Sequence, residues 1–232
     1  MAARTTAWWR AAAGVVLLIV AGAEAGFVGL AAPPEDIALE RFLADPIVPR
    51  QYRAWRRLDA AGGGQRAWME VQTEFDPASG MRFEILAEGG SGLIRSRILR
   101  KLLDEEQELI ARDAAASVAV DAANYSFAAN GVTADGLARI TLQPRRRERA
   151  LIEGEMFLLP EQGTLVRIEG RLARNPSFWM KKVDVTRSYA RINGVLVPTS
   201  LDSTAQMRFF GRSSLRMTYH YAEVAGVAVA AP

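Results

Sequence analysis

The chain has no cysteine and one histidine among its 232 residues. Without cysteine it forms no disulfide, no thiolate zinc site and no acylated N-terminal cysteine. A Ser-His-Asp triad would need His220, which shares a strand face with the polar Arg216 and Thr218, so we interpret it as a solvated histidine. The sequence also lacks G-x-S-x-G, H-E-x-x-H and P-loop motifs. We therefore expect a protein that is not an enzyme, with no catalytic residue, no cofactor and no metal ion.

The chain also lacks a large excess of charge of either sign. The formal net charge is +3, from 29 basic and 26 acidic residues, although the pI is near 9.5. This near balance of charge does not provide the excess of positive charge that is typical of nucleic-acid-binding proteins. The acidic stretch at residues 104–108 has two readings, a cation site or the solvated face of a helix, and we favour the second.

One hydrophobic run stands out, and it lies at the N-terminus. Arg4 and Arg10 precede the uncharged residues 11–23, which as a helix would span roughly 20 Å, short of a bilayer core of roughly 30 Å. Ala23-Glu24-Ala25 has the A-x-A pattern of a signal peptidase site. We expect a cleaved signal peptide at residues 1–25 and a periplasmic protein. An uncleaved inner-membrane anchor reaching Ala32 is the alternative.

Alternating hydrophobicity dominates the remainder. Residues 67–75 and 81–87 alternate with period two around the turn at residues 76–80, which predicts a hairpin. Residues 51–58 fit either a helical turn or a strand, and we favour an extended segment. Further strands are predicted, separated by Gly, Pro and Asn turns, at residues 125–129, 137–143, 150–159, 164–172, 182–192, 201–210 and 214–222.

Two helices interrupt this pattern. A short helix is predicted to begin at the cap Asp36 and to end at Ala44. A long helix, residues 91–115 with Ser91 as N-cap, has an apolar stripe that includes Ile94, Ile98 and Leu102. This stripe must be buried, and the apolar face of the sheet offers the place.

We therefore predict an α+β, mainly β fold. About nine strands form a curved antiparallel sheet, a half-open β-barrel, whose concave face the long helix covers. The expected organisation is a signal peptide (1–25), an N-terminal helix and linker (26–64), the half-barrel domain (65–224) and a C-terminal tail (225–232).

Two sets of residues are candidate binding sites. Apolar strand faces either fill a core or line a cavity for acyl chains, and the sequence leaves both open. The lipid-cavity candidates are Met69, Val71, Phe83, Ile85, Met156, Met207, Phe209, Met217 and Tyr219, with Ile94, Ile98 and Leu102 as lid candidates. A turn carries the second set, Arg145, Arg146, Arg147 and Arg149, which either contacts anionic head groups or is an ordinary soluble turn.

Several segments resemble one known family. They are Asn124-Tyr125-x-Phe127, Leu142-Gln143-Pro144, Leu151-Ile152-Glu153-Gly154, residues 163–170 and the stretch from Pro176-Ser177-Phe178-Trp179 to Tyr189. They are similar to the periplasmic outer-membrane lipoprotein-sorting family, the LolA/LolB-like fold that RseB-type sensor domains share. The resemblance covers roughly residues 65–222 and implies a half-open barrel with helices as a lid over an apolar cavity.

From these observations we expect a non-enzymatic periplasmic protein that binds or transfers lipid or lipoprotein, holding acyl chains in an apolar cavity. Its partners would be acyl chains or a lipoprotein, with an envelope protein as a further partner, and we expect a monomer. The alternative is an envelope sensor or protein-interaction module of the same fold that binds no lipid. A third alternative is an envelope hydrolase with carboxylates that the sequence does not identify.

Overall fold

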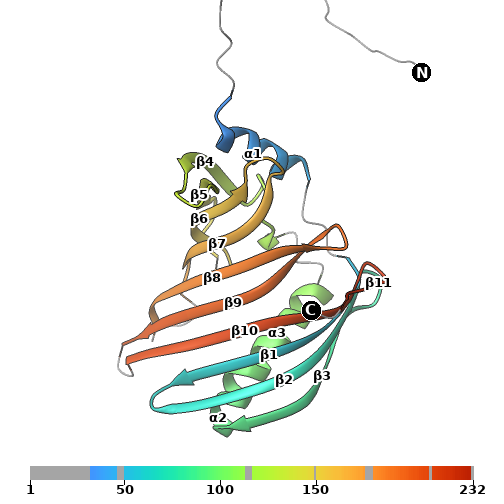
Figure 1. Cartoon of the computed structure of the whole chain (residues 1–232). Helices are drawn as coiled ribbons and strands as arrows, with labels where there is room; N and C mark the ends of the chain where they lie inside the picture. The colour runs from blue at the N-terminus through green and yellow to red at the C-terminus, as the bar shows by residue number, and fades with distance from the viewer. Residues whose placement is uncertain are drawn as a thin grey trace, which may run out of the picture. The chain divides into compact units, whose positions relative to one another are not determined.

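The computed structural model describes residues 32–45, 50–112, 117–148, 150–175, 180–208 and 211–230 (Figure 1). The expected signal peptide lies outside these residues. The elements in chain order are α1 (Pro34–Ala44), β1 (Tyr52–Gly62), β2 (Gln65–Asp76), β3 (Gly80–Gly90), α2 (Gly92–Ile94), the π-helical turn η1 (Arg95–Arg100), α3 (Lys101–Ala111), β4 (Tyr125–Val132), β5 (Ala138–Pro144), β6 (Ile152–Leu159), β7 (Thr164–Leu172), β8 (Met180–Ile192), β9 (Val195–Met207), β10 (Gly211–Val224) and β11 (Val227–Ala228).

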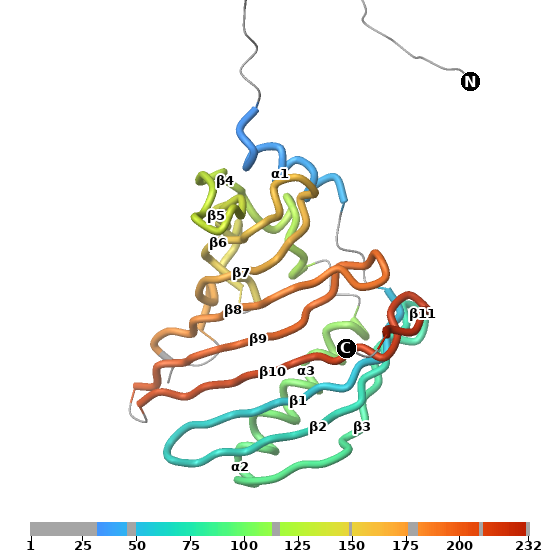
Figure 2. Tube along the Cα trace, in the orientation of Figure 1, coloured from blue at the N-terminus to red at the C-terminus, as the bar shows by residue number. Residues whose placement is uncertain are grey.

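All these strands belong to one antiparallel sheet. Its order is β3-β2-β1-β10-β9-β8-β7-β6-β5-β4, and β11 pairs with β10 outside this path. The sheet curves and stays open, with β3 and β4 as its two edges. Figure 2 shows β4–β7 and α1 towards one end and β1–β3 with α2 and α3 towards the other. The predicted fold class, α+β and mainly β with a helix on a curved antiparallel sheet, is confirmed.

The sheet has eleven strands where about nine were predicted. The segment 51–58, for which an extended conformation was favoured, enters β1, which lies between β2 and β10. Strand β9 begins at Val195, well before the predicted residue 201, because the strand continues through Pro198 instead of starting after it. A shift of register between Ser188 and Tyr189 places Tyr189 opposite Pro198, and such irregularities accommodate proline within a sheet.

Of the two predicted helix caps, Asp36 is wrong, whereas Ser91 occupies the N-cap position of its helix as predicted. Helix α1 begins at Pro34, so Asp36 lies in its first turn. Proline suits that position because its fixed φ fits the first turn and no intrahelical bond is lost. Ser91 makes no side-chain cap; its hydroxyl donates instead to Oε1 of Gln65, 2.5 Å away. The long helix is described to Arg112, so its expected end at residue 115 lies outside the described residues.

Both helical segments pack on the same face of the sheet. Alternate residues of the strands point to this concave face, as the cross-strand pairs Leu58–Met69 and Leu58–Met217 show. Helix α1 buries Ala38 and Phe42 against β4–β7 in one core. The segment α2–η1–α3 covers β1–β3 and β10 in a second core. Leu201 of β9 borders both cores, so the concave face between the two helices lies around this residue.

Candidate functional site

The predicted lipid-cavity residues are divided between the two cores. Met69, Val71 and Met217 are buried beneath α2–η1–α3, with Phe83 and Ile85 half-buried beside them. Met156 is buried in the core under α1. Met207 is half-buried near the end of β9, and Phe209 lies outside the described residues. The covering helix closes the deepest of these positions, and their role in lipid binding stays a prediction.

The lid candidates differ in orientation. Ile94 is buried and Leu102 packs against the same core, together with the fully buried Leu99 and Leu103. Ile98, in contrast, is 44% exposed. The cause is the π-helical turn η1, because its wider turn shifts the phase of the apolar stripe and rotates Ile98 outward. π-Helical turns are frequent at functional sites.

The structure brings together a charged pair that the sequence analysis did not identify. Arg56 of β1 is 0% exposed and lies on the concave face. Its Nη1 donates to Glu106 Oε2 at 2.7 Å and its Nη2 to Glu106 Oε1 at 3.1 Å, a bidentate contact from sheet to helix α3. Glu106 belongs to the acidic run interpreted as a solvated face, but its side chain is 33% exposed and reaches the sheet. The pair therefore joins the covering helix to the concave face of the sheet beneath it, which we call the floor.

Tyrosines complete the surroundings of Arg56. Nη2 also donates to the Tyr52 hydroxyl at 2.9 Å, and the guanidinium carbon lies 4.7 Å from the centre of the Tyr219 ring. Burial alone would lower the pKa of Arg56, but Glu106 and these tyrosines outweigh it and raise the pKa well above its usual value. Burial raises the pKa of Tyr219 to about 12. The cation is thus fixed in its charged form beside neutral phenols.

A second arginine faces the same region from β8. Arg187 lies opposite Leu201, on the concave face, and it is exposed to solvent. Tyr189, Tyr219 and Glu106 are all within electrostatic range, and Tyr189, the strongest of these influences, raises the pKa of Arg187 well above its usual value against the opposing effect of burial. Arg187 is therefore surrounded by protein groups yet reached by water.

The arrangement places cationic and hydrogen-bonding groups beside apolar surface. Two guanidinium groups and several phenols lie on the concave face beside apolar clusters, and helix α3, which carries the Glu106 carboxylate, covers Arg56. Within the described ranges no group of three or more acidic or histidine side chains is placed to hold a metal ion. His220, the one histidine, is exposed on the opposite face beside Trp55, with ring centres 5.1 Å apart.

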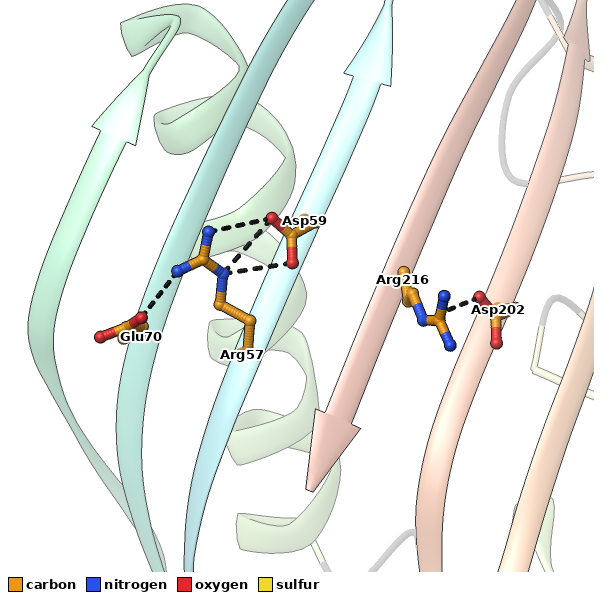
Figure 3. Close-up of polar contacts among 5 residues, drawn as sticks. All are labelled: Arg57, Asp59, Glu70, Asp202 and Arg216. Carbon is orange, nitrogen blue, oxygen red and sulfur yellow. Dashed lines mark hydrogen bonds and ion pairs between the residues drawn. The ribbon is translucent and has the colours of Figure 1, made fainter. Parts of the chain in front are cut away.

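The convex face carries its own charges, which are paired with one another. Figure 3 shows Arg57 between Asp59 and Glu70, with its Nη1 2.6 Å from Glu70 Oε1. It also shows Arg216 with its Nε 3.5 Å from Asp202. A shallow groove of about 590 Å³ runs over these strands. Its lining includes both acidic and basic side chains, Asp59 and Asp202 with Arg66 and Arg216.

The arginine turn is used within the fold. Nε of Arg145 donates to the carbonyls of Ala122 and Tyr125, at 2.9 and 3.1 Å. Arg146 donates to the Ser117 carbonyl and pairs with Glu148. Nε of Arg147 lies 3.4 Å from the Ala173 carbonyl, and Arg149 lies outside the described residues. These contacts tie the turn to neighbouring loops, and contact with an anionic surface stays a prediction.

Comparison with known proteins gives two structural likenesses. No protein-family model matches the sequence, and no curated protein matches it. A LolA superfamily protein from Nitrosomonas europaea is similar over 87% of this chain and 96% of that chain, with 11% identity and a TM-score of 0.39. A DUF1329 family protein from Desulfovibrio piger is similar over 81% of this chain and 90% of that chain, with 8% identity and a TM-score of 0.36.

Proposed function

We propose that the protein is a non-enzymatic lipid-binding protein of the periplasm that holds acyl chains against the concave face of its sheet. The segment Gly92–Ala111 serves as the lid. The observation that carries this proposal is the ion pair between the fully buried Arg56 and the partly exposed Glu106, which joins the lid to the sheet beside apolar contacts. A purely structural helix would be held as well by apolar residues of similar volume, because burying charges costs about as much as their attraction returns.

The energies favour reversible opening. Removing one partner of a fully buried ion pair costs about 3–5 kcal/mol, and this is an upper bound for opening the lid because Glu106 is 33% exposed. Burying one CH₂ group of an acyl chain returns about 0.8 kcal/mol. About four to six buried methylenes therefore offset the loss of the pair, and a long acyl chain exceeds it. Short-chain acids should leave the lid closed. Leu93, 64% exposed, and Ile98 on the outer side of the helix offer apolar surface at which a lipid first makes contact.

Native mass spectrometry of the protein purified from the periplasm, with extraction of whatever it carries, tests the proposal. Delipidated protein is then offered palmitate or hexanoate. We expect uptake of palmitate alone, and its loss in Leu201→Glu, which places a charge on the half-buried floor between the cores. The matched control is Thr204→Glu, on the convex face of the same strand. A clean mass without uptake of either acid contradicts the proposal.

One observation favours the alternative, an envelope sensor or protein-interaction module of the same fold that holds no lipid. Met69, Val71 and Met217 are closed off from solvent, which is what a filled core requires. In that case Leu201→Glu only lowers stability, and the wild-type protein takes up no lipid at any concentration below that at which micelles form.

No helix among the described residues is long and apolar enough to cross a membrane. The expected periplasmic location rests on the signal-like residues 1–25. It is tested by fractionation together with the N-terminal sequence of the purified protein. Recovery of the uncut chain with the inner membrane would replace the free periplasmic protein by a tethered one.

A further inference from the structure

The charges at the centre of the concave face are unequal. Arg56 and Arg187 supply two guanidinium groups, and the carboxylate bonded to Arg56 is that of Glu106. Nε of Arg56 is buried and has no hydrogen-bond partner among the described residues. The site therefore has capacity for a further acceptor in the closed state. That acceptor would best carry negative charge, because both donors are cations.

Opening the lid increases this imbalance. Glu106 is part of α3, so it leaves with the helix, whereas Arg56 and Arg187 belong to β1 and β8 of the sheet and stay. Arg56 would then lie without a carboxylate on a floor made of Leu58, Met69 and Met217. An unpaired buried charge is strongly unfavourable. A neutral lipid that opens the lid bears this full penalty, whereas a lipid that brings an oxyanion removes it.

We propose that the ligand is an anionic amphiphile whose carboxylate or phosphate head group takes the place of the Glu106 carboxylate on Arg56 and Arg187. This inference rests on the proposed lipid-binding function and specifies its ligand class. The planar guanidinium binds a carboxylate or a phosphate through two parallel bonds, as Arg56 already binds Glu106. The hydroxyls of Tyr52 and Tyr189 lie beside the two arginines as further donors. Glu106 thus competes with the ligand from within the chain.

The inference separates ligands of equal chain length. Fatty acids and phosphatidic acid carry the required oxyanion next to their acyl chains. Diacylglycerol, methyl esters and the N-acylated diacylglyceryl end of a lipoprotein do not. A charge-assisted bond to each arginine gives an expected preference of about ten- to a hundredfold for the anionic member of a matched pair. The preference should fall about tenfold when one of the two guanidinium groups is removed.

The test compares two matched pairs of probes on the delipidated full-length protein, palmitate against methyl palmitate and dipalmitoyl phosphatidic acid against dipalmitoylglycerol. Affinities come from native mass spectrometry titrations at fixed salt. The variant is Arg187→Gln, chosen because Arg187 is exposed and is not a member of either core. The matched control is Arg216→Gln, an arginine of β10 on the convex face. Inorganic phosphate alone is a further arm.

The outcomes are distinct. Anionic preference in the wild type that falls about tenfold in Arg187→Gln and persists in Arg216→Gln supports the inference. The probe that is preferred more strongly over its uncharged counterpart identifies the head group, as a carboxylate for palmitate or as a phosphate for phosphatidic acid. Equal binding of both members of each pair overturns the inference while the lipid-binding function stands. If inorganic phosphate binds as tightly as phosphatidic acid, the inference that the ligand is an amphiphile is overturned. Binding of no lipid overturns the proposed function itself.

Discussion

Gly154 of β6 and Gly170 of β7 face each other so closely that neither has room for a side chain. A Cβ on Gly154 would lie 2.0 Å from the Glu169 carbonyl oxygen, and one on Gly170 would lie 2.3 Å from that of Glu153. The two strands approach this closely at a point on the concave face next to the core under α1. This glycine pair permits a sharp local bend of the sheet.

We predict that Gly154→Ala lowers the free energy of unfolding by about 1–3 kcal/mol, because the added methyl group forces the two backbones apart. Gly92→Ala is the control. Its Cβ would have no neighbour nearer than 3.8 Å, and alanine in the first helical turn should be neutral or stabilising by up to about 1 kcal/mol. Urea midpoints of the two variants measure the difference. Equal urea midpoints would contradict the prediction, because they would mean that the two strands move apart without a loss of stability.

The lid interpretation predicts a local effect of Leu99→Ala. Leu99 of η1 is fully buried against the sheet, so the cavity left behind should cost about 2–5 kcal/mol. If the helix opens as a unit, amide hydrogen exchange should accelerate over residues 92–111 while β5–β7 stay protected. Ile98→Ala, at an exposed position, should stay within about 0.5 kcal/mol of the wild type. Equal acceleration in β5–β7 would show that the helix is an integral part of one core.

Strand alternation and turn residues predicted most of the sheet and the helix on its concave face. The Arg56–Glu106 pair was not predictable in the same way. Arg56 alternates with Ala54 and Leu58 as an apolar residue would, which is the one signal in the sequence that an arginine points inward. Its partner is 50 residues away and faces the sheet from a helix whose phase η1 has shifted. Local patterns define faces, but contacts between distant elements depend on how those faces are stacked.

Tyr219 makes stability sensitive to alkaline pH. Its folded pKa of about 12 lies above the unfolded value near 10, because burial disfavours the phenolate. Its contribution to stability is therefore complete below about pH 10 and is lost as the pH rises through about 12, at up to about 1.4 kcal/mol per pH unit. Tyr219→Phe should lose less stability between about pH 9 and pH 11 than the wild type. Identical losses in urea titrations would assign the alkaline sensitivity to other groups.

A substitution in the arginine turn can show whether these arginines stabilise the fold or bind an anionic membrane surface. Arg146 donates to the Ser117 carbonyl, so Arg146→Ala should lower stability by about 1–2 kcal/mol and leave binding to anionic vesicles unchanged. Arg212→Ala, at an exposed position in β10, is the control for lost charge. Sedimentation with phosphatidylglycerol vesicles gives the readout. Weaker sedimentation of Arg146→Ala alone, at unchanged stability, would support the head-group contact that the sequence suggested.

A double-mutant cycle of Arg56→Met and Glu106→Leu measures what the Arg56–Glu106 pair contributes to the lid. Glu106→Leu leaves the buried guanidinium unpaired and should cost about 3–5 kcal/mol. The double variant removes both charges from an apolar interface, so we expect it to regain most of that loss or to exceed the wild type. Because the apolar replacements should hold the closed lid at least as firmly as the ion pair did, the lid should then open more rarely, and exchange of bound palmitate should slow. Glu108→Leu, which removes an exposed ion pair with Arg112 on the same helix, should change neither quantity. A double variant that is stable yet exchanges lipid faster would mean that the pair holds the lid closed more firmly than apolar contacts do, and that the charges do not serve its release.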